Sequence, residues 1–107
     1  MFARVTLVEI DTVRIDPAAA VAQFTSQVLP ELRAQAGYQG VYVLMNPDGK
    51  ALLMSLWSAE EQAQSNVASG YYQAQLAKFA TVFASPPGRE QYAVVLADSP
   101  TPSTASP

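Results

Sequence analysis

The sequence of 107 residues contains no cysteine and no histidine. The lack of cysteine excludes disulfides, thiol nucleophiles and thiolate metal sites. The lack of histidine removes the side chain that most often serves as a general base or a metal ligand near neutral pH. Together these absences exclude much enzyme chemistry, and we expect no bound metal.

Positive charge is also scarce. Six basic residues stand against nine acidic ones, which gives a net charge of −3. The basic residues are spread singly along the chain, so they form no patch of the kind that neutralises a phosphate backbone. Nucleic acid is therefore not an expected partner.

Long hydrophobic runs are missing as well. No apolar run approaches the roughly 18 residues that a membrane span needs. The N-terminal stretch MFARVTLVEIDTVRID lacks the basic segment and following apolar segment of a signal peptide. We expect a cytoplasmic protein that does not contact a membrane.

Apolar residues are abundant, at 50% of the chain. This content and length fit one compact domain, which we place at residues 1–97. The Pro/Ser/Thr-rich C-terminal tail, residues 98–107 (DSPTPSTASP), has almost nothing apolar to bury, and such a composition is typical of disorder.

Local patterns in the first third of the chain predict a strand over residues 2–10 and a helix over 17–36. Asp16 followed by Pro17 is a typical helix start, and Gly37 is expected to end the helix. Pro30 lies within the apolar stripe of this helix, where it removes a backbone hydrogen bond. We expect a kink or break near Val28 and Leu29.

The rest of the chain predicts two strands, helices and a last strand. Strands over 38–45 and 50–57 flank Asn-Pro-Asp-Gly at 46–49, which favours an antiparallel hairpin. Ser58 and Glu61 match a capping box for the next helix. Gly70 is expected to interrupt that helix, a further helix covers residues 71–83, and the last strand covers 91–97. The order βαββαβ predicts an α+β, ferredoxin-like fold with a four-stranded antiparallel sheet.

The expected strands carry apolar side chains on both faces. In the second strand, Tyr38, Tyr42 and Leu44 are expected on one face, opposite the face of Val43 and Met45. The chain has enough helix to cover only one face, so we expect a second copy of the chain to cover the other. Burying several hundred Å² of apolar surface contributes on the order of 10 kcal/mol before association costs. The alternative is that the C-terminal tail or a long loop folds over this face.

The segment VLPELRAQAGYQGVYVLMNPDGKALLMSLWSAEEQ, residues 28–62, resembles the dimeric α/β-barrel superfamily, and most closely its antibiotic biosynthesis monooxygenase-like (ABM-like) branch. The shared features are a proline-kinked helix end, the hairpin and a strand that ends in Trp before an acidic helix. The resemblance extends more loosely to residues 75–80. It implies a homodimer in which each subunit has a pocket between its sheet and its helices.

The resemblance also implies candidate site residues. In the cofactor-free oxygenases of the branch, Trp, Asn and Tyr side chains lie near the pocket, and Trp57, Asn66 and Tyr72 are the corresponding candidates for catalysis. The Asn66 amide would hold a substrate oxyanion, and Arg4 or Arg89 would add positive charge. The residues expected to bind the ligand are Arg4, Tyr42, Met54 and Phe79. No cofactor is expected.

Three functions are compatible with this pattern. The first is a cofactor-independent monooxygenase, or a related pocket enzyme, that acts on a small aromatic compound. The second is a non-catalytic homodimer that binds a small apolar ligand, in which Trp57 is a core anchor and Asn66 a helix cap. The third, haem binding or degradation, is disfavoured because Thr6, Asn66 and Leu76 stand where the haem-degrading group has Asn, Trp and the haem-ligating His.

Overall fold

The computed structural model describes residues 1–98 as a sheet covered on one side by helices. The elements in chain order are β1 (Phe2–Glu9), α1 (Pro17–Gln27), α2 (Leu29–Arg33), β2 (Tyr38–Met45), β3 (Lys50–Trp57), α3 (Glu60–Ala68), α4 (Tyr71–Ala77) and β4 (Gly88–Ala93). The sheet has four strands in the order β2-β3-β1-β4, and all neighbours are antiparallel. This arrangement confirms the ferredoxin-like fold. Apart from Asp98, the predicted tail lies outside the described residues.

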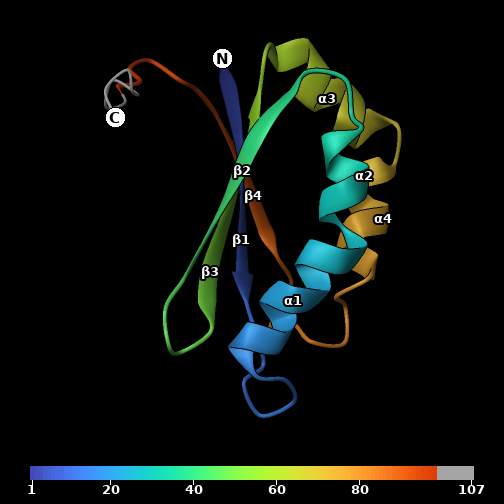
Figure 1. Ribbon diagram of the computed structural model, residues 1–107, viewed down its shortest axis with the longest axis vertical. Helices are drawn as coiled ribbons and strands as arrows, with labels where there is room; N and C mark the ends of the chain where they lie inside the picture. The colour runs from blue at the N-terminus through green and yellow to red at the C-terminus, as the bar shows by residue number, and fades with distance from the viewer. Residues whose placement is uncertain (99–107) are drawn as a thin grey trace, which may run out of the picture.

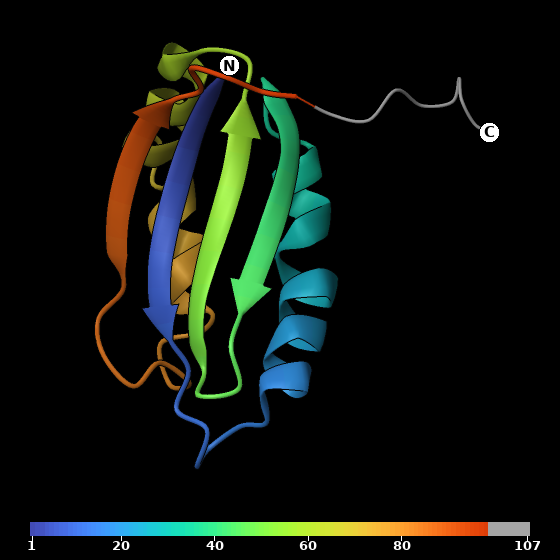
Figure 2. The ribbon, with the colours of Figure 1, turned by 90° about the vertical axis from the view of Figure 1, so that its left-hand side faces the viewer.

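All the helices pack against the same face of the sheet (Figure 1), and the other face is bare (Figure 2). We call these the closed face and the open face. Within residues 1–98, no helix has the length and apolar character that crossing a membrane requires.

The first helical segment is broken where Pro30 predicts it. The Asp16 side chain accepts a hydrogen bond from Ala18 N at 3.1 Å, which starts α1 at Pro17. Val28 lies between α1 and α2 with φ of −112°, and Pro30 occupies the first turn of α2. Helix α2 ends at Arg33, a little earlier than the expected end near residue 36, and Gly37 adopts a φ of 79° beyond it.

The hairpin between β2 and β3 is also confirmed. The Asn46 side chain accepts hydrogen bonds from Asp48 N and Lys50 N at 3.0 and 3.1 Å. Gly49 has a φ of 88°, and its N–H donates to Asn46 O at 3.0 Å. Asn46 therefore closes the turn with its side chain, and Gly49 supplies the left-handed residue that the turn needs.

The capping box predicted for α3 is wrong. The N-cap position is Ala59, which has no side chain to cap the helix, and α3 starts at Glu60. The Ser58 hydroxyl donates to the Gln62 side chain, and Ser58 N donates to Gly37 O at 2.8 Å. Ser58 therefore fixes the loop after β3 to the loop before β2. The break at Gly70 is confirmed, with a φ of 86° between α3 and α4.

The last helix and the last strand differ from their expected bounds because the chain after α4 pairs with β1 and the residue that follows it. Helix α4 ends at Ala77 and not near Phe83, since Phe83 forms a bridge with Ile10 and Ala84 N donates to Glu9 O at 2.7 Å. Strand β4 covers 88–93 and not 91–97. Ala93 pairs with Phe2, where β1 begins, and Val94 N donates to Met1 O at 3.0 Å, so β1 offers no residue for the chain beyond Val94 to pair with.

A bulge in β2 corrects the predicted face of Tyr38. Tyr38 pairs with Trp57 and Gly40 with Leu56, so the register shifts by one residue between them. Tyr38 therefore lies on the closed face, where its ring meets that of Trp57 edge-on with centroids 6.2 Å apart. Tyr42 and Leu44 stay on the open face, as expected.

The core fills the space between the closed face and the helices. Its buried cluster contains Phe24, Val28, Leu32, Trp57, Ala63 and Phe79. Trp57 is fully buried, and its indole Nε1 donates to Ser55 Oγ at 2.9 Å. Trp57 of β3 therefore shares one buried cluster with residues of α1, α2 and α3.

The open face remains apolar and uncovered by the described residues. Its large exposed side chains are 37% to 60% accessible: Leu7, Tyr42, Leu44, Leu52 and Tyr92. Leu44, Leu52 and Leu7 lie directly beside one another across β2, β3 and β1. Residues 94–98 leave the sheet at its top edge (Figure 2), with Val95 and Leu96 93% and 81% exposed, so this part of the chain does not cover the face.

Candidate functional site

A cavity of about 90 Å³ lies between the closed face and helices α1, α2 and α4. Its walls are mainly apolar, with contributions from Val8, Phe24, Leu32, Leu53 and Phe79. The polar residues that line it are Arg4, Thr6, Ser55, Tyr71, Tyr72 and Gln75. An apolar cavity with a few convergent polar groups is typical of a small-molecule site.

Arg4 is the central polar residue of this cavity, and it is only 3% exposed. It projects from β1 toward the helices because it alternates with Ala3 and Val5 along the strand. Its Nη1 donates to Asn66 Oδ1 at 2.7 Å and to Ala63 O at 3.4 Å. Among residues 1–98, Arg4 forms no ion pair. The guanidinium is therefore a buried cation without a carboxylate partner.

Two aromatic rings flank the Arg4 guanidinium. Its Cζ atom lies 5.1 Å from the centroid of the Trp57 ring and 4.5 Å from that of the Tyr72 ring. These cation–π contacts compensate part of the lost hydration. Burial lowers the pKa of Arg4 from 12.5 to about 10, so Arg4 still carries its charge at neutral pH.

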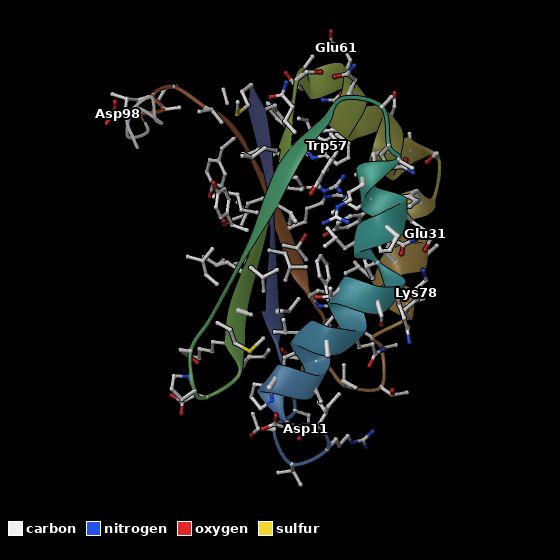
Figure 3. The ribbon with its side chains drawn as sticks, in the orientation of Figure 1. Asp11, Glu31, Trp57, Glu61, Lys78 and Asp98 are labelled. Atoms are coloured by element: carbon white, nitrogen blue, oxygen red, sulfur yellow. The ribbon has the colours of Figure 1, made fainter. Side chains whose placement is uncertain are left out.

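Asn66 and Trp57 stand behind Arg4 and do not line the cavity. The Asn66 amide is engaged at both ends, because Oδ1 accepts from Arg4 and Nδ2 donates to Gln35 Oε1 at 3.2 Å. Figure 3 shows Trp57 at the upper end of the space between sheet and helices. Both side chains thus hold the guanidinium in place, and the expected direct contact of Asn66 with a substrate oxyanion does not fit this position.

Tyr72 contributes both its ring and its hydroxyl to the site. The hydroxyl forms a hydrogen bond with Thr6 Oγ1 at 2.7 Å, which ties α4 to β1. The ring is flanked by Arg4 and, with Cζ 5.4 Å from its centroid, by Arg89. The helix break at Gly70 starts α4 so that Tyr72 faces the sheet.

Three buried polar atoms in the cavity walls have no hydrogen-bond partner among the described residues. They are Arg4 Nε, Tyr71 Oη and Gln75 Oε1. Tyr71 and Gln75 are one helical turn apart on α4, so they present their polar groups to the same side. Burial, and to a smaller extent the charge of Glu31, raises the pKa of Tyr71 to about 12. Tyr71 is therefore a neutral phenol that can donate a hydrogen bond.

A polar clasp joins the two helical segments on either side of the cavity. Lys78 pairs with Glu31 on α2, as Figure 3 shows, and its Nζ donates to Gln27 O at 2.9 Å. Gln23 Nε2 donates to Lys78 O at 3.1 Å. We call these four residues the Lys78 clasp. It fixes the segment after α4 to α1 and α2, which form the opposite wall.

The structure brings together five of the seven predicted site residues and separates two. Arg4, Trp57, Asn66 and Tyr72 form one contact network, and Phe79 lines the same cavity. Tyr42 and Met54 pair with each other on the open face, so they cannot contact a ligand in this cavity. Met54 and Trp57 lie three residues apart on a strand, which already places them on opposite faces.

Sequence reasoning missed four polar residues of the cavity: Thr6, Ser55, Tyr71 and Gln75. A signal existed for the first two, because Thr6 follows Arg4 by two residues and Ser55 precedes Trp57 by two. Tyr71 and Gln75 could not be identified in the same way, since the orientation of α4 depends on the turn at Gly70.

No protein-family model matches the chain, and no curated protein sequence matches it. Solved structures do match. A protein of unknown function from Nitrosomonas europaea is 23% identical over 94% of each chain, with a TM-score of 0.71. A monooxygenase from Streptomyces coelicolor, solved with the ligand nanaomycin D, is 19% identical over 94% of this chain and 92% of its own, with a TM-score of 0.70.

A third structure is described as a cofactor-independent oxygenase, SnoaB from Streptomyces nogalater. It is 10% identical over 90% of this chain and 94% of its own, with a TM-score of 0.71. Identities at this level establish the fold and not the activity. The chain therefore shares its fold with solved structures described as monooxygenases or putative antibiotic biosynthesis monooxygenases, which is the fold that the sequence resemblance predicted.

Proposed function

We propose that this protein is a cofactor-independent monooxygenase, or a related pocket enzyme, that acts on a small aromatic compound. The observation that carries the proposal is the buried Arg4 cation, which faces an apolar cavity and has no ion pair among residues 1–98. The similarity in fold to the two Streptomyces oxygenases supports the same class of reaction.

Arg4 supplies what a cofactor-free oxidation of a phenol needs. A cation beside a bound phenol lowers the phenol's pKa, so the phenolate is favoured although the cavity offers no strong base. The phenolate is electron-rich and reacts with O₂ at the ring carbon that it activates. When that carbon is a CH₂ group, one oxygen atom becomes the new carbonyl and the other leaves as water, and the carbon supplies all the electrons.

The remaining residues divide into two roles. Tyr72 lines the cavity beside Arg4 and contacts the substrate in this proposal. Asn66 and Trp57 act through Arg4, because both touch the guanidinium and neither lines the cavity. They are positioning residues that keep the cation aimed at the developing negative charge. Phe79 forms part of the apolar wall that holds the ring.

The proposal includes a homodimer formed through the open face. The row Leu44, Leu52 and Leu7 and the exposed Tyr42 and Tyr92 form an apolar surface that is unfavourable in water. A second copy would bury it, and the ABM-like fold resemblance supports the same arrangement. Because the sheet is the floor of the cavity, the dimer would also stiffen the strand that carries Arg4.

A second candidate is a non-catalytic homodimer that binds a small apolar ligand. The small volume of the cavity, about 90 Å³, and its mainly apolar walls favour this alternative. An apolar cavity of about 150 Å³ accepts a benzene ring, so a polycyclic substrate would require the helices to move. Turnover separates the two candidates, since the second predicts binding alone.

Oxygen uptake in the presence of an anthrone-like phenol tests the proposal. We expect uptake with the parent protein and its loss in Arg4→Gln, because the phenolate loses its counter-charge. Arg14→Gln is the matched control, since Arg14 lies in the loop after β1 with 65% of its side chain exposed. The absence of uptake by the parent, or equal uptake by Arg4→Gln, would contradict the proposal.

A further inference from the structure

The three unpaired polar atoms of the cavity indicate what its ligand carries. A buried polar atom without a partner costs free energy, and native proteins rarely retain such atoms. Here Arg4 Nε, Tyr71 Oη and Gln75 Oε1 all belong to residues that line one cavity, and Arg4 is only 3% exposed. A ligand with polar oxygen atoms at one end would satisfy them together.

The charges around Arg4 indicate whether the polar end of the ligand is positive or negative. Arg89 on β4 also contacts the Tyr72 ring, with its Cζ 5.4 Å from the ring centroid, and adds a second positive charge. The titratable groups that influence Arg4 from the packed elements are Tyr71, Tyr72 and Arg89. Glu31, the acidic residue whose charge influences Tyr71, is paired with Lys78. The site is therefore locally positive in a protein whose net charge is −3.

We propose that the cavity binds its aromatic ligand as a monoanion, with the ionised oxygen at Arg4 Nε and a hydrogen bond from Tyr71 Oη. This inference rests on the proposed function for the aromatic nature of the ligand and specifies its charge. Gln75 Oε1 accepts from a hydroxyl or water next to the ionised oxygen. The ionised oxygen belongs to a carboxylate or to a phenolate, since both present the same acceptor to a guanidinium.

The rest of the cavity limits the size of this anion. Beyond Arg4 the walls are apolar and include Phe24, Leu53 and Phe79. A volume of about 90 Å³ is smaller than the roughly 150 Å³ that accepts a benzene ring, so even a single ring requires a small movement of the helices and larger ring systems are disfavoured. A one-ring anion is therefore the natural probe.

Binding of benzoate and benzamide at pH 7, measured by calorimetry, tests the charge. The two compounds have nearly the same shape, and only benzoate is an anion. We expect benzoate to bind at least about tenfold more tightly than benzamide to the parent protein, because charge-assisted hydrogen bonds are the stronger ones. In Arg4→Gln this preference disappears. Equal affinity for both compounds, or no saturable binding of either, would overturn the inference.

A second variant guards against a folding defect in Arg4→Gln. Tyr71→Phe removes one hydroxyl and leaves the ring, so the fold is retained. We expect it to weaken benzoate binding by about threefold to tenfold and to leave benzamide binding almost unchanged. An unchanged benzoate affinity in Tyr71→Phe would remove Tyr71 from the site. Thermal unfolding of each variant without ligand reports whether the fold is intact.

A chromogenic phenol distinguishes phenolate from carboxylate recognition. We expect bound 4-nitrophenol to be more ionised than the free compound at the same pH, by its visible absorbance, and Arg4→Gln to abolish the difference. Benzoate preference without this shift assigns the site to carboxylates, and loss of both overturns the inference. None of these measurements involves O₂, so anion binding without oxygen uptake would reject the monooxygenase alone.

Discussion

Arg4 Nη1 donates a hydrogen bond of 2.7 Å to Asn66 Oδ1, and this bond joins the central strand β1 to helix α3. Both side chains are buried, at 3% and 4% exposure. The bond holds the guanidinium near the Trp57 and Tyr72 rings and leaves its Nε without a hydrogen-bond partner among residues 1–98. The position of the Arg4 guanidinium therefore depends on Asn66.

Asn66→Ala should disturb both the fold and the site. It removes the 2.7 Å acceptor and leaves Arg4 Nη1 with only Ala63 O at 3.4 Å. We expect the free energy of unfolding to fall by about 1–3 kcal/mol, and oxygen uptake to fall through kcat more than through KM. Denaturant titration and steady-state kinetics measure the two effects. Unchanged uptake would remove Asn66 from the proposed mechanism.

Asn66→Asp tests the effect of the Arg4 charge while keeping the shape of the side chain at position 66. Aspartate has the shape of asparagine, and its carboxylate would pair with the Arg4 guanidinium. We expect folding to be retained and benzoate binding to weaken about tenfold or more, because the cavity loses its net positive charge. Calorimetry checks the affinity. Benzoate binding as tight as in the parent would show that the Arg4 charge does not attract the ligand.

The Lys78 clasp should control access to the cavity. Lys78→Ala removes the pair with Glu31 and the bond to Gln27 O, and both are near the surface, so stability should change by less than about 1 kcal/mol. We expect benzoate to associate several-fold faster, because α4 and α2 separate more readily. Stopped-flow mixing measures the rate. Lys50→Ala, in the β2–β3 hairpin region, is the control that should leave the rate unchanged.

Tyr71 should make stability fall at high pH. Its pKa is raised by burial from 10.0 to about 12 in the folded protein, so folding favours the protonated form. That contribution is complete below pH 10 and is lost as the pH rises from about 10 to about 12. Arg4, whose pKa is lowered to about 10, contributes in the opposite direction over the same range. We therefore expect Tyr71→Phe to gain stability relative to the parent across this range in denaturant titrations, and a constant difference would contradict the shift.

Particular residues show what the sequence could and could not predict. Pro30, Asn46 and Gly49 act through local backbone constraints, and the break and the hairpin that they predict are present. Strand alternation predicts the wrong face for Tyr38 because alternation holds only without a bulge, and the bulge before Gly40 arises from pairing with β3. The end of β4 depends on where β1 begins, which no local pattern contains.

For the candidate site, the sequence indicates some of the residues but not how they are arranged. The family resemblance brought Trp57, Asn66 and Tyr72 together, and the structure places all three around Arg4. It did not reveal that the guanidinium stands between Asn66 and the cavity. That arrangement depends on the packing of α3 against β1, which distant residues determine together.

The open face provides the test of the dimer. Leu44→Glu places a charge in the middle of the apolar row formed with Leu52 and Leu7. We expect the parent to sediment as a dimer and the variant to shift to monomer, since an unpaired charge at such a surface opposes association. Val13→Glu, at a loop position 94% exposed, is the control that should remain dimeric. A folded monomeric parent at micromolar concentration would rule the dimer out.

The fate of the oxygen atoms during turnover shows directly whether the protein is a monooxygenase that depends on Arg4. The protein is supplied with an anthrone-like phenol under ¹⁸O₂, and the product is analysed by mass spectrometry. If the protein is a monooxygenase that works through Arg4, the parent forms a product that carries one heavy oxygen atom and Arg4→Gln does not. A product whose new oxygen comes from water, or a yield that does not depend on Arg4, would contradict this mechanism.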